Sequence, residues 1–215
     1  MFDLIYTAVQ NTHDSTTKVV VRDIFSIDKP AQKLTYRPFQ KKLHNKFLLW
    51  HGSRQTSVLA NIREGLRVQP NEAPVTGLMF GKGIYLTDCF TKAVGQCQIN
   101  HKGNDSQPKL GVMFLAEAAL GEMHRAYSPG QFRGAPQFSH SVYGVGKFKP
   151  CIKGLKDLNN EAEDFELNEE TLQTPQPLFF NTGKMKPNPE LGEGPQHDEG
   201  LHDLKFNDFV VYDNA

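Results

Sequence analysis

Short apolar stretches separated by polar segments run along the whole chain, and each stretch predicts one small element. Apolar residues at helical spacing predict a helix over Phe2–Val9. β-Branched and aromatic residues between Val19 and Ile27 predict a strand that ends before Pro30. The apolar stretch Phe47–Trp50 predicts a buried strand followed by a helix, so His51 is expected on the connection between them.

Helix signals follow this strand and lead into a long loop. Thr56 or Ser57 is a suitable N-cap for a helix that runs through Glu64, and Gly65 is a suitable residue to end it. The segment 68–82 holds two prolines and several turn formers, and a loop of this length in a compact domain usually has a function. We expect it to cover a substrate.

The second half of the chain predicts short strands joined by loops. Ile84–Leu86 reads as a strand, and Asp88 is a good N-cap for a helix over Cys89–Gln98, whose inward face would comprise Phe90, Ala93, Val94 and Cys97. The apolar segment Leu110–Leu120 predicts a central strand. Residues 121–174 predict loops around short strands, and a last strand over Phe206–Tyr212 would carry Asp208 at its start.

This order of elements favours an α+β fold. The strands are short and do not alternate regularly with helices, which argues against a doubly wound parallel sheet. The Gly81-Lys82-Gly83 turn lacks the third glycine and the long helix of a dinucleotide-binding fingerprint. With 215 residues, 38% of them apolar, the chain is long enough for one large core, and we expect a single domain over residues 1–215.

Charge and cysteine content narrow the range of partners. The net charge is zero, but residues 151–215 carry five basic and fourteen acidic side chains. No basic stripe suited to phosphates is visible, so we expect no direct DNA-binding module. The acidic segment 157–170 is interpreted as a solvated loop or helix face, with a self-modification region as the alternative. Cys89, Cys97 and Cys151 show no paired spacing, which predicts free thiols and no metal site.

The chain also has no apolar run long enough to span a bilayer, and its start does not have the layout of a secretion signal. We therefore expect a soluble, intracellular protein without membrane contact.

Three motifs carry a resemblance to a known family. They are LLWHGSR at residues 48–54, EAPVTGLMFGKGIYLTD at residues 72–88, and FNDFVVY at residues 206–212. Together they resemble the NAD-binding core of the poly(ADP-ribose) polymerases, and the resemblance covers nearly the whole chain. It is greatest to the members that respond to DNA damage. It implies the ADP-ribosyltransferase fold, a mixed and mostly antiparallel split β-sheet with few flanking helices.

The resemblance implies that NAD is the substrate and names three catalytic residues: His51 for the adenosine ribose, Tyr85 for the nicotinamide ribose side, and Asp208 at the place of the family's glutamate. Independently of it, a glycine such as Gly52 lets the backbone approach a flat ligand and offer both N–H and C=O to a carboxamide. Aspartate is one methylene shorter than glutamate, which puts chain elongation in doubt.

Further residues are assigned to NAD binding by the same resemblance: Ser53 and Arg67 on the adenosine half, and Gly83 in the turn that presents Tyr85. Ala93 and Gln96 stand where the family has a serine that bonds the nicotinamide amide and a tyrosine that stacks on its ring. The two losses are worth about 0.5–1.5 kcal/mol each, together roughly 5- to 150-fold in affinity. We expect modest affinity for NAD.

Three other matching positions have weaker assignments. Leu78 replaces a tyrosine of the family's donor loop, Lys92 matches a lysine near the acceptor side, and His44 is expected to pack or hydrogen-bond locally. The resemblance does not extend to the helical subdomain that covers the site in the family, so we expect the site to be open to NAD.

The main functional hypothesis is transfer of ADP-ribose from NAD to protein acceptors, with the chain itself as a candidate acceptor, by a monomer without a metal. Two alternatives stay open: a catalytically silent module that binds NAD or ADP-ribose, and transfer to nucleic acid ends. Nuclear placement follows from the resemblance only, and a cytoplasmic location is also possible.

Overall fold

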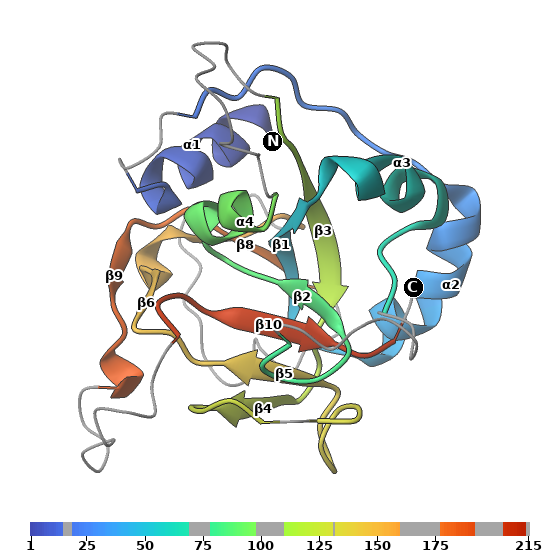
Figure 1. The fold of residues 1–215 in the computed structure, drawn as a ribbon, viewed down its shortest axis with the longest axis vertical. Coiled ribbons are helices and arrows are strands. Elements are labelled where there is room, and N and C mark those ends of the chain that lie inside the picture. Colours follow the sequence, from blue (N-terminus) through green and yellow to red (C-terminus); the bar gives the residue numbers. More distant parts are fainter. Residues whose placement is uncertain are drawn as a thin grey trace.

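The structure is a computed structural model that describes residues 1–14, 19–68, 78–97, 110–130, 132–159, 177–191 and 204–213. Within these ranges four α-helices and two short 3₁₀ turns surround the strands (Figure 1). The helices are α1 (Phe2–Thr12), α2 (Pro30–Lys42), α3 (Gln55–Glu64) and α4 (Phe90–Gln96), and the 3₁₀ turns are η1 (Ile152–Gly154) and η2 (Pro189–Leu191).

The strands form two four-stranded sheets and one two-stranded sheet. The first sheet has the order β3-β1-β8-β7, the second β2-β10-β5-β4, and the third pairs β6 with β9. The strands are β1 (Lys46–Ser53), β2 (Ile84–Leu86), β3 (Val112–Ala119), β4 (Met123–Ala126), β5 (Ser141–Gly144), β6 (Phe148–Pro150), β7 (Leu155–Asp157), β8 (Leu178–Asn181), β9 (Met185–Pro187) and β10 (Asp208–Val211).

Antiparallel pairing dominates these sheets. Among the described strands only the pairs β1 with β8 and β4 with β5 are parallel. The two larger sheets meet where Trp50 of β1 and Thr87, just after β2, exchange backbone hydrogen bonds of 2.8 and 2.9 Å. The predicted α+β fold with a split, mostly antiparallel sheet is confirmed.

The core beside β1 is built from aromatic rings on both of its sides. Trp50 packs edge-on against Phe90 of α4 at 5.2 Å and lies 6.2 Å from the ring of Phe180 on β8. Ala8 and Val9 of α1 are buried in the same cluster. Burying a large aromatic side chain stabilises a fold by about 1.5–3 kcal/mol, so these contacts hold α1 and α4 against the first sheet.

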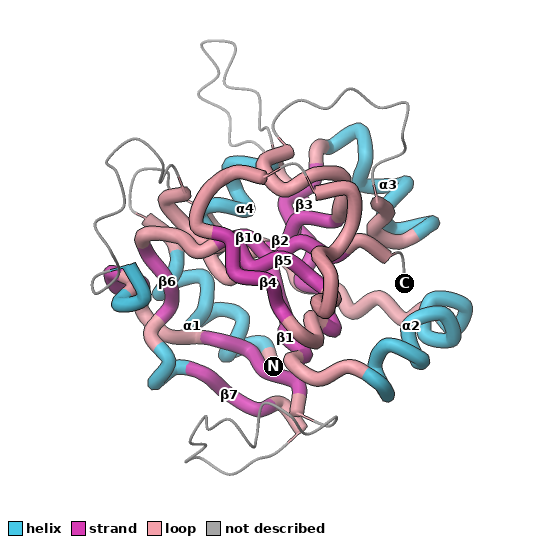
Figure 2. The backbone as a smooth tube through the Cα atoms, turned by 90° about the horizontal axis from the view of Figure 1, so that it is seen from below, coloured by secondary structure: helices cyan, strands magenta, loops and turns pink. Residues whose placement is uncertain are grey.

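One predicted strand is wrong, and one helix was missed. Residues 19–29 form no strand. Val19 and Val21 pack on the core, but none of the described strands pairs with them, and Phe25 is 82% exposed. The next helix, α2, begins at Pro30, whose fixed φ and missing N–H suit the first turn of a helix. None of its residues is buried. A helix that buries no face against the core needs no clear apolar stripe in its sequence. Figure 2 shows α2 at the periphery, away from the central strands.

The long apolar strand β3 was expected to be central but lies at the edge of its sheet, with β1 as its only partner among the described strands. The strands predicted at residues 47–50 and 84–86 are confirmed, although β1 continues to Ser53. Gly65 ends α3 as predicted, with a φ of 85° that favours glycine.

The predicted helix starts are shifted. Helix α3 begins at Gln55 with Arg54 as its N-cap, so neither Thr56 nor Ser57 caps it. Cys89, not Asp88, is the N-cap of α4. Most of the predicted covering loop, and most of the acidic segment, lie outside the described residues. The described cysteines are free thiols, as predicted.

Candidate active site

His51 lies inside β1, not on the connection after it as the sequence suggested, and it pairs with Phe114 of β3. Its Nδ1 lies 2.9 Å from the carbonyl oxygen of Tyr85. A carbonyl can only accept, so Nδ1 carries the hydrogen and Nε2 keeps a lone pair. Burial lowers the pKa of His51. The imidazole is therefore neutral near pH 7, with Nε2 available to accept a hydroxyl hydrogen.

The phenol of Tyr85 is fixed by the turn that precedes β2. It donates a hydrogen bond of 2.8 Å to the Gly81 carbonyl and accepts one of 3.0 Å from the Phe80 N–H. Burial raises the pKa of Tyr85 to about 12, the Phe80 N–H opposes this, and the negative charge of Asp208 adds to it. The side chain therefore stays a neutral phenol, held within the electrostatic reach of Asp208.

Strand pairing brings Asp208 to the same face as Tyr85. In the antiparallel pair β2 and β10, Phe209 lies opposite Leu86 and Val210 opposite Tyr85. Asp208 lies two residues before Val210, so alternation along β10 puts both side chains on the same face, which is also the face of Tyr85. Strand β10 lies between β2 and β5 (Figure 1).

The Asp208 carboxylate is buried and paired. Its Oδ2 lies 2.7 Å from Nζ of Lys92, a residue of α4, and the side chain is only 6% exposed. Burial raises the pKa of Asp208, and the Lys92 ammonium opposes that effect. The second oxygen, Oδ1, is buried and has no hydrogen-bond partner among the described residues. A buried acceptor without a partner costs free energy, so Asp208 is an exception to the usual pairing of buried polar groups.

Gly52 is required by the packing of α4 on β1. A Cβ at this position would overlap the Ala93 carbonyl oxygen and lie 2.7 Å from Cβ of Gln96. The Gly52 N–H points to the Gln96 side chain, whose Oε1 accepts a long hydrogen bond of 3.4 Å. The structure therefore brings Gly52, Ala93 and Gln96 together, and the Gln96 side-chain amide faces the Gly52 N–H.

The remaining predicted binding residues divide into two groups. Gly83 and Ser53 lie next to the site: a Cβ on Gly83 would be 2.8 Å from the Val211 carbonyl oxygen, and the Ser53 hydroxyl accepts a 2.9 Å hydrogen bond from Asn61. Arg67 lies apart from these contacts, because its guanidinium is 63% exposed and pairs with Glu64 at 3.0 Å. Its part in NAD binding stays a prediction.

The positions with weaker assignments also have defined surroundings. His44 makes a polar contact, with its Nε2 3.2 Å from the Glu122 carboxylate, which agrees with the expectation that it packs or hydrogen-bonds locally. Leu78 accepts a hydrogen bond from the Gly81 N–H in the turn that holds the Tyr85 phenol.

Sequence reasoning missed two polar residues beside Asp208. Asn207 is 1% exposed and donates a hydrogen bond of 2.7 Å from its side chain to Asp88 Oδ2. Its own side-chain oxygen accepts the Gly146 N–H at 2.9 Å. The available signal was the position of Asn207, directly before an acid at the start of a strand. Its partner Asp88 was interpreted as a helix cap, so the contact between the two was not expected.

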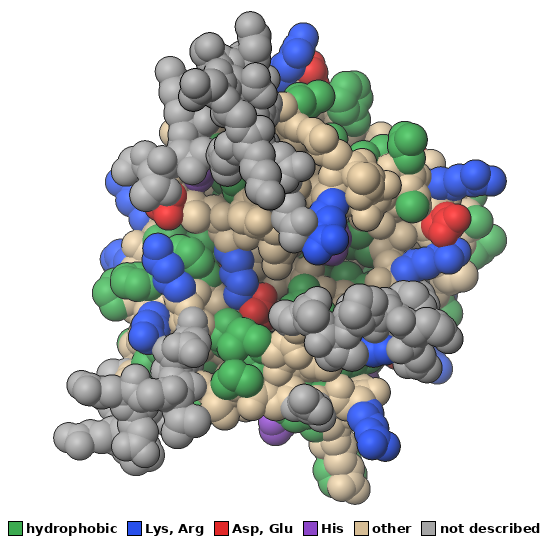
Figure 3. All heavy atoms as spheres, viewed as in Figure 1, with side chains coloured by type: hydrophobic (Ala, Val, Ile, Leu, Met, Phe, Trp, Pro, Cys, Tyr) green, Lys and Arg blue, Asp and Glu red, His purple; other side chains and the backbone are tan. Residues whose placement is uncertain are grey.

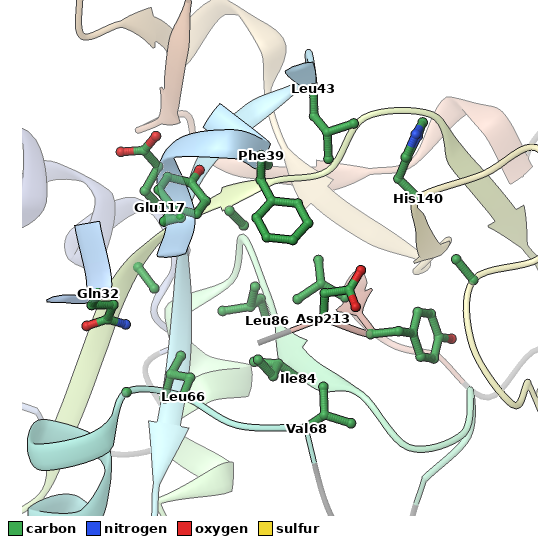
Figure 4. Close-up of a pocket in the computed structure, with 18 of the residues that line it drawn as sticks. Gln32, Phe39, Leu43, Leu66, Val68, Ile84, Leu86, Glu117, His140 and Asp213 are labelled. Atoms are coloured by element: carbon green, nitrogen blue, oxygen red, sulfur yellow. The ribbon is translucent and has the colours of Figure 1, made fainter. Parts of the chain in front are cut away.

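A cavity of about 1040 Å³ lies elsewhere, between α2 and the outer edge of β3 (Figure 4). Phe39 projects into it from α2, while Ile84 and Leu86 line it from β2 and His140 borders it on another side. His51, Gly52, Tyr85 and Asp208 do not line it. The candidate active site is thus separate from this cavity.

Comparison with known proteins decides the family. The poly(ADP-ribose) polymerase catalytic domain matches residues 1–215. The chain belongs to this family. Poly [ADP-ribose] polymerase 1 of Xenopus laevis is 42% identical over 210 residues, which are 96% of this chain and 18% of that protein. The poly [ADP-ribose] polymerase of Sarcophaga peregrina is 34% identical over 215 residues, 99% of this chain and 18% of that protein.

Poly [ADP-ribose] polymerase 2 of Homo sapiens is 31% identical over 220 residues, 98% of this chain and 32% of that protein. The chain thus spans a third or less of the length of these relatives. The family resemblance drawn from the three sequence motifs is confirmed, and the α+β architecture is the one it implied.

In the part of the chain that the structure describes, no group of three or more His, Cys, Asp or Glu side chains is placed to hold a metal ion. None of the helices described is long and apolar enough to cross a bilayer. On the face shown in Figure 3, the described Lys and Arg side chains lie in separate places and form no continuous stripe.

Proposed function

We propose that this chain is one catalytic domain, spanning residues 1–215, that cleaves the nicotinamide glycosidic bond of NAD and transfers ADP-ribose to protein side chains. The observation that carries the proposal is the convergence of His51, Tyr85 and Asp208. His51 bonds the Tyr85 carbonyl, and Asp208 lies on the Tyr85 face of the paired strands β2 and β10. Membership of the poly(ADP-ribose) polymerase family supports this assignment.

NAD would bind along the line from β1 to β10. The neutral imidazole of His51 offers Nε2 to a ribose hydroxyl of the adenosine half. The Gly52 backbone takes the nicotinamide carboxamide once the long bond to Gln96 opens. The Tyr85 ring would lie beside the nicotinamide ribose, as the family resemblance implies. Ser53, Gly83 and Ala93 shape the walls, and Arg67 would have to leave Glu64 to reach the pyrophosphate.

The reaction needs negative charge beside the sugar carbon C1′. The bond between C1′ and the nicotinamide nitrogen breaks, and its electron pair leaves with nicotinamide, which becomes neutral. Positive charge develops on the sugar and is stabilised by the Asp208 carboxylate. An acceptor oxygen then bonds to C1′. Where the acceptor is a hydroxyl, its proton passes to Asp208 and from there to water.

The replacements Ala93, Gln96 and Asp208 predict the product. A serine hydroxyl and a stacking tyrosine are both absent from the nicotinamide side, so affinity for NAD is modest. The aspartate carboxylate lies further back than a glutamate would, in contact with Lys92. Mono-adducts or short polymers are therefore expected as products.

The cellular setting is proposed from the family alone. Protein acceptors, including the chain itself, would carry the product. The names of the relatives are those of poly(ADP-ribose) polymerases 1 and 2, and a nuclear role in the response to DNA damage is the corresponding proposal. We also propose a monomer that binds NAD as a substrate and needs no metal.

The test is incubation of the chain with labelled NAD, followed by intact mass measurement and assay of free nicotinamide. Wild type should release nicotinamide and gain ADP-ribose adducts. Gly52→Trp should bind no NAD, and His51→Ala should bind it much more weakly. His44→Ala is the matched control, because His44 pairs locally with Glu122, and it should behave like wild type. Normal turnover by Gly52→Trp would refute the assigned pocket.

A second candidate is a silent module that binds NAD or ADP-ribose without cleaving it. The observation that favours it is the Gln96 amide, which faces the Gly52 N–H at 3.4 Å. In this case the same assay shows saturable binding of labelled NAD, and no nicotinamide is released from the wild-type chain.

A further inference from the structure

The segment that leads into β10 has no regular structure of its own, yet polar contacts fix it at several atoms. Lys92 donates from Nζ to the carbonyl oxygens of Phe206 at 3.0 Å and Asn207 at 3.2 Å, besides its ion pair with Asp208. Thr87 donates from Oγ1 to the same Asn207 carbonyl at 2.9 Å. The backbone just before Asp208 is therefore held by Lys92 of α4 and by Thr87 of the β2–α4 connection.

The Asn207 side chain supplies the remaining contacts. Its Nδ2 donates to Asp88 Oδ2 at 2.7 Å, and its Oδ1 accepts the Gly146 N–H at 2.9 Å. Gly146 is fixed in turn, because its carbonyl accepts a 3.0 Å hydrogen bond from Asn188. Asn207 thus spans two separate segments, one on each side of β10, and its orientation depends on the acceptor at Asp88.

We propose that Asp88 is a positioning residue, which acts through Asn207 to set the direction of the Asp208 carboxylate. This inference rests on the proposed function, because it takes Asp208 as the residue that contacts the sugar. An aspartate has one side-chain torsion fewer than a glutamate, so its carboxylate follows the backbone more closely. A chain with aspartate at position 208 therefore depends on the exact placement of residue 207.

Two observations argue that Asp88 is not present for stability. Its Oδ1 is buried and has no partner among the described residues, which costs free energy. Burial also raises its pKa to about 6, against the hydrogen bond from Asn207 and the charges of Lys92 and Lys149. An acid that is costly to ionise and is tied to the neighbour of a catalytic carboxylate is typical of a functional site.

The experiment exchanges the two side chains. In Asn207→Asp, one oxygen still accepts the Gly146 N–H, but the other faces the Asp88 carboxylate as a like charge. In the double variant Asp88→Asn with Asn207→Asp, the new amide donates to the new carboxylate, and every hydrogen bond is restored. We expect kcat for nicotinamide release to fall at least 10-fold in Asn207→Asp and to return within 3-fold of wild type in the double variant. KM for NAD should stay within 3-fold throughout.

Asp88→Ala should also lose about 10-fold in kcat with little change in KM. Asp157→Asn is the matched control: this acid accepts the backbone N–H groups of Asn159 and Leu178 far from the site, and the variant should keep the kcat of wild type. Thermal melting of each variant separates loss of the fold from loss of positioning. The double variant is the reference for this comparison, because its exchanged pair keeps all the hydrogen bonds.

The outcomes separate this inference from the proposed function. Rescue of kcat by the double variant supports the inference. Suppose that the wild type is active but the double variant folds and stays as slow as Asn207→Asp. This result overturns the inference and leaves the proposed function standing, and so does a rise in KM of Asn207→Asp in place of a fall in its kcat. A wild-type chain that releases no nicotinamide overturns the proposed function and this inference with it.

Discussion

Substitution of Gly52 by alanine tests whether this glycine is required for the packing of α4 on β1 or only for contact with a ligand. The new Cβ would lie 2.7 Å from Cβ of Gln96 and 2.9 Å from the Ala93 carbonyl carbon. Carbon atoms pack at about 3.5–4.0 Å, so α4 has to move away from β1 by roughly 1 Å. Overpacking of this kind costs about 1–3 kcal/mol. For a chain of this length the melting temperature should fall by about 2–12 °C.

Activity should fall further than stability, because α4 also carries Lys92, which contacts Asp208 at 2.7 Å. A misplacement of about 1 Å can cost roughly 100-fold in rate, and nicotinamide release should fall by that order. The control is Gly95→Ala on the same helix, where a Cβ would meet nothing within 4 Å. This variant should melt at or above the wild-type temperature and keep its activity. If Gly52→Ala melts and turns over like wild type, the packing argument is refuted.

Three further variants test the site. Asp208→Glu should lengthen the polymer, seen on a gel of automodification products, because it extends the carboxylate; unchanged product size would mean that another feature limits elongation. Gln96→Tyr should tighten NAD binding in calorimetry about 2- to 13-fold, the worth of one ring stacking, and unaltered affinity would contradict the stacking assignment. Asp88 has its pKa raised from 3.8 to about 6, so the folded state binds more protons between these values and stability falls as pH rises. From pH 7 to pH 5, wild type should therefore gain about 1 kcal/mol relative to Asp88→Asn in thermal melts; equal pH responses would show that Asp88 ionises freely.

Much of the fold was readable from local sequence signals. Phe47–Trp50 and Ile84–Leu86 are short and apolar on nearly every position, and both are strands. Gly65 ended α3 because only glycine adopts a φ of 85° at little cost. The site residues His51, Tyr85 and Asp208 came from motifs whose family was then confirmed.

The errors arose where pairing partners decide the structure. The β-branched residues 19–21 have the composition of a strand, but a strand needs a neighbour to satisfy its backbone, and no described strand pairs with them. β3 is as apolar as a central strand, yet position within a sheet depends on which strands pair beside it. Asp88 looked like a helix cap because the donor that it accepts from, the Asn207 side-chain amide, is 119 residues away in sequence.

The sequence by itself determined the family, the α+β class and the chemical types at the site, because these depend on residue identity and on spacing over a few positions. Only the tertiary structure decided which groups meet. The Asp208 carboxylate contacts Lys92, the Gly52 N–H faces Gln96, and Asn207 joins Asp88 to Gly146. Each of these contacts joins residues more than 40 positions apart in the sequence. Long-range contacts of this kind are fixed by the packing of the whole sheet and not by local preference.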